Sequence, residues 1–203
     1  MVKTEDVLQY VQQLAPAALA EDWDNVGALV DCGGDVTSIL VALDITEEVV
    51  AEAEYQGCQL IVSHHPVIFK PLRQITRRDV TYRMIKKNIS AVCAHTNLDA
   101  AEGGVNDILC KLFGVADPKS FDKIGRVGRL ARPSGAQQLA LACQETLGAH
   151  VKLVDAGRPV ATLAVVGGSG GSMLKEAAAA GADALLTGEA SHHDANCIKG
   201  GIE

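Results

Sequence analysis

Aromatic residues and long apolar runs are scarce in this 203-residue chain. Phe, Trp and Tyr together make up 3% of it, and there is a single tryptophan. No apolar run approaches the about 18 residues that a membrane-spanning helix needs. The opening stretch, MVKTEDVLQYVQQLAP, is charged and amphipathic, unlike a signal peptide. We therefore expect a soluble, cytoplasmic protein without a membrane partner.

Paired cysteines are also missing. None of the six cysteines lies in a CxxC motif, and their spacing is not that of a disulfide framework. This pattern argues against a thiolate zinc site and indicates a reducing compartment. The cysteines are Cys32, Cys58, Cys93, Cys110, Cys143 and Cys197.

Positive charge is in the minority. The formal net charge is −7 at pH 7, and the sequence pI is near 5.3. Because no cluster of Lys and Arg is interleaved with aromatic residues, charge argues against nucleic acid as a partner. A small molecule, including a phosphorylated one, remains compatible with this charge.

The first half of the chain alternates between short apolar runs and helical patterns. β-branched runs of this kind are typical of buried parallel strands, and the alternation predicts an α/β fold with a mostly parallel or mixed sheet covered by helices. The predicted strands are 38–44, 58–63 and 89–94, and the predicted helices are 4–14, 47–56, 79–88 and 105–113.

The second half repeats this plan, which predicts two similar lobes. A strand at 159–168, a helix at 172–180 and a strand at 182–188 follow one another, and Gly181 aligns with Gly57 as a helix cap. With 48% hydrophobic residues, the chain is large enough for two small cores. The segment 116–138 is rich in Gly, Pro and charge, so we expect a linker there, in which Ile124, Val127 and Leu130 allow one strand. The predicted domains are 1–120 and 121–203.

Polar side chains follow three of the predicted strands at the point where each strand ends. In an open parallel sheet, ligands bind beyond the carboxyl ends of the strands. We therefore expect these side chains to converge on one site. They are Asp44 after the first strand, His64 and His65 after the second, and His95 with Asp99 after the third.

Two metal ions are one interpretation of this convergence. Pro66 favours an extended His65, and successive extended residues point in opposite directions, so His64 and His65 suit different ions, with Asp99 as a bridge. Two ions about 3.5–4 Å apart activate water for hydrolysis. Ligation by nitrogen and oxygen suits Zn, Mn, Fe, Co or Ni.

Structural interpretations compete with this one. A histidine after a strand is often a hydrogen-bonded structural residue rather than a ligand. Asp44 is equally suited to capping the helix that starts after Thr46. We interpret Trp23, Asp24 and Asn25 as a turn beneath the site.

Two motifs in the second half carry weaker signals. GGSGGS, residues 167–172, is either a phosphate cradle or a tight turn between a strand and a helix. TGEASHHDA, residues 187–195, gathers His192 and His193 with acidic residues at the end of the last strand. These histidines either line the site or belong to a solvated turn.

Five stretches, taken together and in order, resemble the NIF-three-like family, also called domain of unknown function 34 or GTP cyclohydrolase 1 type 2 homologue. They are WDNVGALV, LIVSHHPVIF, AHTNLDAAEGGVND, GRVGRL and GADALLTGEASHHDA. The resemblance implies two similar α/β lobes, a dinuclear metal site between them and a homo-oligomer, a hexameric ring built from dimers. By motif, it makes His64, His65 and Asp99 metal ligands and places His95 in or beside the coordination shell.

The sequence departs from the family at its end. The family completes its site with a further His and Glu some residues after SHHDA, whereas this chain ends in KGGIE. Either the chain is truncated or the site is partial. In a partial site we expect one of two metals to bind weakly or not at all, unless His192 or His193 substitutes for the missing ligand.

Three hypotheses follow. The first is a metal-dependent hydrolase of a nucleotide or another small molecule, in which His95, His192 or His193 moves protons. The second is a metal-binding regulatory or interaction protein, or a metal chaperone, without turnover. The third is a structural oligomer with vestigial ligands.

Overall fold

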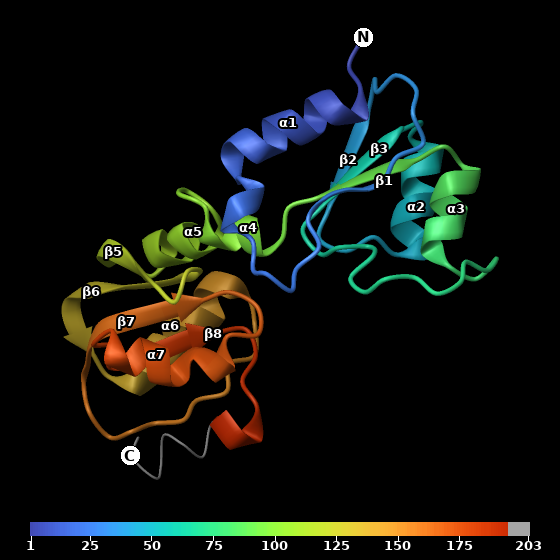
Figure 1. The fold of residues 1–203 in the computed structure, drawn as a ribbon. Coiled ribbons are helices and arrows are strands. Elements are labelled where there is room, and N and C mark those ends of the chain that lie inside the picture. Colours follow the sequence, from blue (N-terminus) through green and yellow to red (C-terminus); the bar gives the residue numbers. More distant parts are fainter. Residues whose placement is uncertain (195–203) are drawn as a thin grey trace. The chain divides into compact units, whose positions relative to one another are not determined.

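The chain divides into two compact units, of which the first comprises Met1–Glu102 and the second begins at Gly103. A computed structural model describes residues 1–194. Each unit contains its own four-stranded mixed sheet covered by helices, which confirms the predicted fold class (Figure 1). No helix in the described part of the chain is both long and apolar enough to span a bilayer.

The first unit is built around the sheet β1-β4-β3-β2. Its strands β2, β3 and β4 are parallel, and β1 is antiparallel to β4. The predicted helices and parallel strands are present, whereas β1 lies just after the predicted turn at 23–25, in a stretch for which no strand was predicted. The elements are α1 (Thr4–Leu14), η1 (Ala17–Leu19), β1 (Gly27–Val30), β2 (Ile39–Ala42), α2 (Glu47–Tyr55), β3 (Leu60–Ser63), α3 (Val80–Lys86), β4 (Ser90–Cys93) and α4 (Thr96–Ala100).

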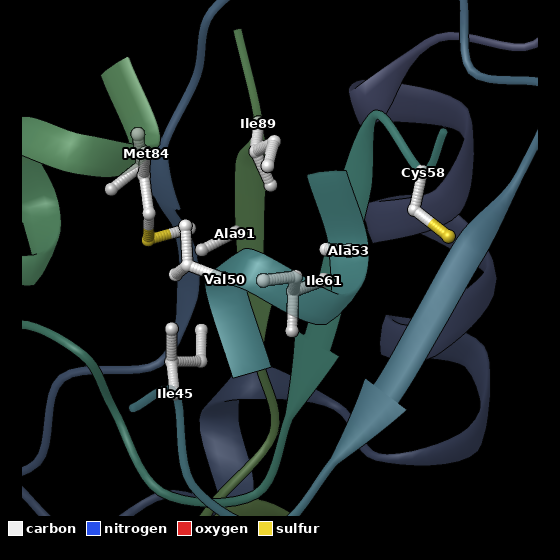
Figure 2. Close-up of a cluster of buried hydrophobic side chains, with 9 residues drawn as sticks. Ile45, Val50, Ala53, Cys58, Ile61, Met84, Ile89 and Ala91 are labelled. Atoms are coloured by element: carbon white, nitrogen blue, oxygen red, sulfur yellow. The ribbon is translucent and has the colours of Figure 1, made fainter. Parts of the chain in front are cut away.

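Helices α2 and α3 cover one face of this sheet. Val50 of α2 and Met84 of α3 are fully buried and pack with Ile61 of β3 and Ala91 of β4 (Figure 2). Thr46 caps α2 by accepting a hydrogen bond from the Val49 backbone N–H at 3.3 Å. The cap fixes the start of α2 at the end of the short connection 43–46 that follows β2.

Helix α1 covers the opposite face. Val7 and Val11 of α1 pack with Leu60 of β3 and Val92 of β4. Because strand side chains alternate between faces, Leu60 points to this face while its neighbour Ile61 points to the other. The central strands are therefore covered on both sides, which explains their continuous apolar sequence.

The second unit is built around the sheet β5-β6-β7-β8. Strand β5 is antiparallel to β6, β6 is antiparallel to β7, and β7 is parallel to β8. Helix α5, which the sequence analysis grouped with the first lobe, packs through Cys110 against Leu163 and Val165 of β7. The elements are α5 (Val105–Leu112), β5 (Val115–Phe121), β6 (Gly125–Ser134), α6 (Ala136–Leu147), β7 (Val160–Val166), η2 (Gly171–Met173), α7 (Leu174–Ala179) and β8 (Ala184–Thr187).

The prediction that 116–138 is a linker was wrong, although the one strand allowed within it is present as β6. The segment forms most of β5, all of β6 and the start of α6. The polar composition of the segment indicated a linker, but one of its charged residues is part of the fold. Arg126 is only 5% exposed, and its Nε lies 2.5 Å from the Asp107 carboxylate. Gly128 is needed for packing, since a Cβ there would lie 2.5 Å from the Ala116 carbonyl oxygen. Charged residues that are paired in the fold, and glycines that are needed for close packing, therefore resemble a linker when only the sequence is known.

Candidate metal centre

Three histidines of the first unit come together at the ends of two neighbouring parallel strands. His64 and His65 follow β3, and His95 follows β4 two residues after Cys93. Each offers a ring nitrogen, and these three atoms lie within 4.8 Å of one another. The register places Ser63 beside Cys93, so both strands deliver their histidines at the same level of the sheet.

The first two rings are each held through Nδ1. His64 Nδ1 donates to the Ala94 carbonyl oxygen at 3.0 Å, and His65 Nδ1 donates to Asp44 Oδ1 at 2.6 Å. A carbonyl oxygen can only accept, so His64 carries its proton on Nδ1. In both rings the lone pair of Nε2 is therefore left for a metal ion.

The contact with His65 decides between the two interpretations of Asp44. Thr46 caps α2, and the Asp44 carboxylate orients the His65 ring. Both side chains of this pair are about half exposed, at 46% for His65 and 55% for Asp44. Asp44 therefore belongs to the shell around the candidate ligands.

His95 is held by Asp24, a residue that the sequence analysis assigned only to a turn. His95 Nδ1 lies 2.9 Å from Asp24 Oδ1. The other carboxylate oxygen of Asp24 accepts from the backbone N–H and the hydroxyl of Thr96, at 3.1 and 2.5 Å. The Asp24 side chain is fully buried. Burial alone would raise its pKa, but the hydrogen bonds from Thr96 and His95 hold the pKa below its ordinary value.

Asp99 adds a carboxylate beside the three rings. It lies on α4, one turn after His95, and Oδ1 is 3.7 Å from Nε2 of His64. Burial raises the pKa of the Asp99 carboxyl, against the attraction of His64 and His95. Burial likewise lowers the pKa of His64, which favours the neutral ring that a metal requires. A cation bound here would offset the burial of the carboxylate.

Two exposed aromatic rings stand beside His95. Trp23 and Phe69 are 61% and 46% exposed, and each ring centroid lies 6.4 Å from that of His95. The turn that carries Trp23 is tied to the loop after β3, because Asn25 Nδ2 donates to the Ile68 carbonyl oxygen at 2.5 Å. The turn lies at 21–24, where the Asp24 N–H donates to the Glu21 carbonyl oxygen at 3.0 Å, so it overlaps the turn predicted at 23–25 and shapes the edge of the site.

The donor set suits a divalent transition metal ion. Three imidazole nitrogens with a carboxylate beside them match the ligand preferences of Zn, Fe, Co, Ni and, with more oxygen, Mn. The hydrogen bonds at each Nδ1 are the outer-shell contacts that accompany metal-bound histidines. The cluster of His64, His65 and His95 is therefore a site that can hold a metal ion.

The predicted residues of the second unit have different surroundings. His192 and His193 are exposed at the start of a helical segment after β8. Ser191 precedes this segment. Asp194 accepts hydrogen bonds from the Ser191 backbone N–H and hydroxyl, at 2.8 and 2.7 Å. A role for these two histidines in proton transfer or metal binding stays a prediction. The end of the chain, where the family's further His and Glu were expected to be missing, lies outside the described residues.

GGSGGS, residues 167–172, matches the tight-turn interpretation. The Gly170 N–H donates to the Thr187 hydroxyl at 2.8 Å, and the Gly171 N–H donates to the Glu189 carbonyl oxygen at 3.1 Å. Both amides are thus engaged inside the protein. A phosphate cradle would need them to face a ligand.

Comparison with known proteins gives consistent matches over nearly the whole chain. The family model Duf34/NIF3 (NGG1p interacting factor 3) matches residues 2–201. A Clostridium perfringens protein named GTP cyclohydrolase 1 type 2 homolog is 34% identical, over 95% of this chain and 79% of the relative. The NIF3-like protein 1 of Drosophila melanogaster is 33% identical, over 95% of this chain and 71% of the relative.

Solved structures show the same fold. A hypothetical protein of Staphylococcus aureus matches with a TM-score of 0.87 and 26% identity, covering 98% of this chain and 83% of the other. Reduced HcgD from Methanocaldococcus jannaschii matches with a TM-score of 0.79 and 28% identity, with the same coverage of both chains.

Proposed function

Because the chain belongs to the Duf34/NIF3 family, we propose that it is a metal-dependent hydrolase that uses His64, His65 and Asp99 as ligands of a dinuclear site. One observation carries the proposal. Three histidine rings converge at two strand ends, and the Nδ1 of each is engaged by an acceptor, so each Nε2 is left for an ion. A structural histidine needs no such convergence.

The chemistry divides between the ion and the chain. A divalent ion, when bound, supplies Lewis acidity and lowers the pKa of water. His95 is held in one orientation by Asp24, as a proton-transferring histidine must be. Because Asp24 engages Nδ1 of His95, Nε2 is the atom that would bind the ion or, where it does not, would accept a proton from water and give it to the leaving group.

The substrate of the proposed reaction is a nucleotide or another small molecule. Trp23 and Phe69 expose aromatic surface beside His95, which suits a planar ring. The relatives named GTP cyclohydrolase 1 type 2 homolog make GTP the first compound to test.

The first test is metal content per chain, measured by elemental analysis of protein purified without chelator. We expect about two ions per chain in a complete site, and a loss in His65→Ala. The matched control is His150→Ala, an exposed histidine of the second unit. Unchanged metal in His65→Ala, or equal loss in both variants, would contradict the site.

The second test is turnover of GTP and a panel of phosphoesters and cyclic amides by the metal-loaded protein. We expect hydrolysis that requires added metal and falls at least tenfold in His65→Ala. Full metal occupancy without turnover of any compound would instead favour the second candidate function.

That second candidate is a non-catalytic metal-binding protein that regulates a partner or delivers metal. It is favoured by the exposure of the His65 side chain, at 46%, because an exposed ligand allows an ion to exchange. Rapid transfer of the bound ion to a chelator, without turnover, would support it.

Homo-oligomerisation is part of the proposal. Family resemblance suggests a hexameric ring, and the chain exposes large apolar side chains on β2, with Val41 at 77% and Ile39 at 41% exposure. Light scattering at micromolar concentration would give a mass of six chains, and a monomer mass would contradict the ring.

A further inference from the structure

We propose that a hollow beside α3 binds a small anion carrying two or more phosphate groups, at a site separate from the metal centre. The supporting feature is a concentration of positive charge in an otherwise acidic chain. Between residues 70 and 87 there is one acidic residue, Asp79, although acidic residues outnumber basic ones by 25 to 18 overall. The cations of this segment are Lys70, Arg73, Arg77, Arg78, Arg83, Lys86 and Lys87.

Five of these cations surround one hollow on the first unit. Its volume is about 810 Å³, within the range of small-molecule sites. None of the lining residues is a member of the histidine cluster. The lining residues are Glu47, Arg77, Arg78, Tyr82, Arg83, Lys86 and Lys87.

The charges around the hollow are not balanced by the protein. Arg83 pairs with Glu47 at 2.6 Å, and Lys87 pairs with Glu54 of α2. Arg77, Arg78 and Lys86 have no acidic partner among the described residues. Like charges gathered without partners repel one another, and a bound anion removes that repulsion.

Local structure fixes the backbone that carries the three unpaired cations. Thr76 donates from its backbone N–H and its hydroxyl to Asp79 Oδ2, at 2.5 and 2.7 Å, and this turn leads into α3. These hydrogen bonds engage the Asp79 carboxylate, and the turn places Arg77 and Arg78 shortly before the first residue of α3. Lys86 follows on the helix, and Arg83, one turn before it, lies on the same face.

The ligand class follows from these groups. Arginine binds phosphate oxygens in a bidentate manner, and two adjacent arginines with a lysine suit more than one phosphate. Tyr82, which also lines the hollow, adds a hydroxyl and a ring face for an organic part such as a nucleoside. A long nucleic acid fits less well, because the rest of the chain is strongly acidic and would repel its backbone.

Isothermal titration of the full chain with inorganic pyrophosphate tests the proposal. The test variant is Arg77→Gln/Arg78→Gln, which removes two exposed, unpaired lining charges. The matched control is Lys70→Gln/Arg73→Gln, which removes two exposed charges of the same loop outside the hollow. We expect at least a tenfold weaker affinity in the test variant and less than a threefold change in the control. Equal weakening in both would overturn the proposal, because it would indicate diffuse attraction.

A second arm separates this site from the metal centre, since metal ions also bind pyrophosphate. His65→Ala is expected to leave the affinity within twofold, whatever its metal content. Loss of pyrophosphate binding in His65→Ala would assign the anion to the metal centre and overturn the proposal.

In a third arm, a labelled 20-nucleotide single strand competes with the small anion for the protein. Tighter binding of the strand than of pyrophosphate or ATP, lost in the Arg77→Gln/Arg78→Gln variant, would overturn the small-anion assignment in favour of nucleic acid.

Discussion

The buried carboxylate of Asp24 lies 2.9 Å from Nδ1 of His95, a residue 71 positions further along the chain. This contact joins the turn before β1 to the end of β4. It also gives the least exposed part of the candidate metal centre a fixed negative charge, because the Asp24 side chain is fully buried. Asp24 is therefore a positioning residue for His95.

We expect Asp24→Asn to weaken metal binding about 10–100-fold, the usual effect of removing an outer-shell partner. It should also destabilise the fold by about 1–3 kcal/mol, because the amide cannot accept from both His95 and Thr96 without turning a donor toward one of them. Chelator competition and urea unfolding measure the two effects. Glu102→Gln removes the same charge at an exposed position and should change neither. Equal metal affinity in Asp24→Asn and the native chain would contradict the role of Asp24.

Asp24 also predicts a dependence of stability on acid. Burial opposes ionisation, but the hydrogen bonds from Thr96 and His95 place its folded pKa below the unfolded value of about 3.9. Its contribution is thus complete above about pH 4 and is lost as pH falls through the folded pKa. Urea unfolding from pH 7 to pH 3, with metal chelated, should show the stability gap between the native chain and Asp24→Asn narrowing only below about pH 4. A constant gap over this range would contradict the lowered pKa.

The single tryptophan should report metal binding. Trp23 lies beside His95, with ring centroids 6.4 Å apart, so an open-shell ion on the histidines is close enough to quench its fluorescence. We expect saturable quenching by Co²⁺, Ni²⁺ or Cu²⁺, and little by Zn²⁺, which has a closed shell. Titrations of His65→Ala should require more metal, whereas His150→Ala should behave as the native chain. Identical titrations in the two variants would place the ion elsewhere.

Cys93 should be dispensable for metal binding despite its position. Its thiol donates to the His64 carbonyl oxygen at 3.1 Å, and burial, helped by the charge of Asp24, raises the pKa of Cys93 to about 12. A thiol that stays protonated is not a metal ligand. Cys93→Ala should therefore retain its metal in elemental analysis and lose about 1 kcal/mol of stability from the lost contact. A loss of metal comparable to that in His65→Ala would show thiolate ligation instead.

Gly128 should resist substitution in the second unit. A Cβ there would lie 2.5 Å from the Ala116 carbonyl oxygen and 2.7 Å from Cγ1 of Val115, so β5 would have to move. We expect Gly128→Ala to destabilise the chain by about 1–3 kcal/mol in thermal or urea unfolding. Gly135→Ala is the control, because its new Cβ would meet only the end of Gln138, at 3.9 Å. Similar losses in both variants would mean that steric contact is not the cause.

Sequence reasoning located the histidines because parallel strands place their carboxyl ends at one edge. The strand runs before His64 and His95 are short and apolar, so their ends can be read directly from the sequence. Asp24 could not be found in this way, since its partner is distant in the chain and its own surroundings indicate only a turn.

Two other features could not be predicted from the sequence, because composition and net charge are averages over many residues. Arg126, which is buried and paired with Asp107 of α5, made part of β6 look like a polar linker, because composition does not reveal which charges are paired. Net charge concealed the cations around the hollow for a similar reason, since acidic residues elsewhere in the chain outnumber them. Both features depend on pairing in three dimensions.

The register that sets Ser63 beside Cys93 has a consequence for how the protein matures. If β3 and β4 paired one residue out of step, side chains on one of them would switch faces, and the three rings would no longer meet. An ion can therefore be acquired only by chains whose sheet has assembled in the native alignment. The fraction of chains that bind metal in a preparation would then measure the fraction of chains that have folded with the native strand register.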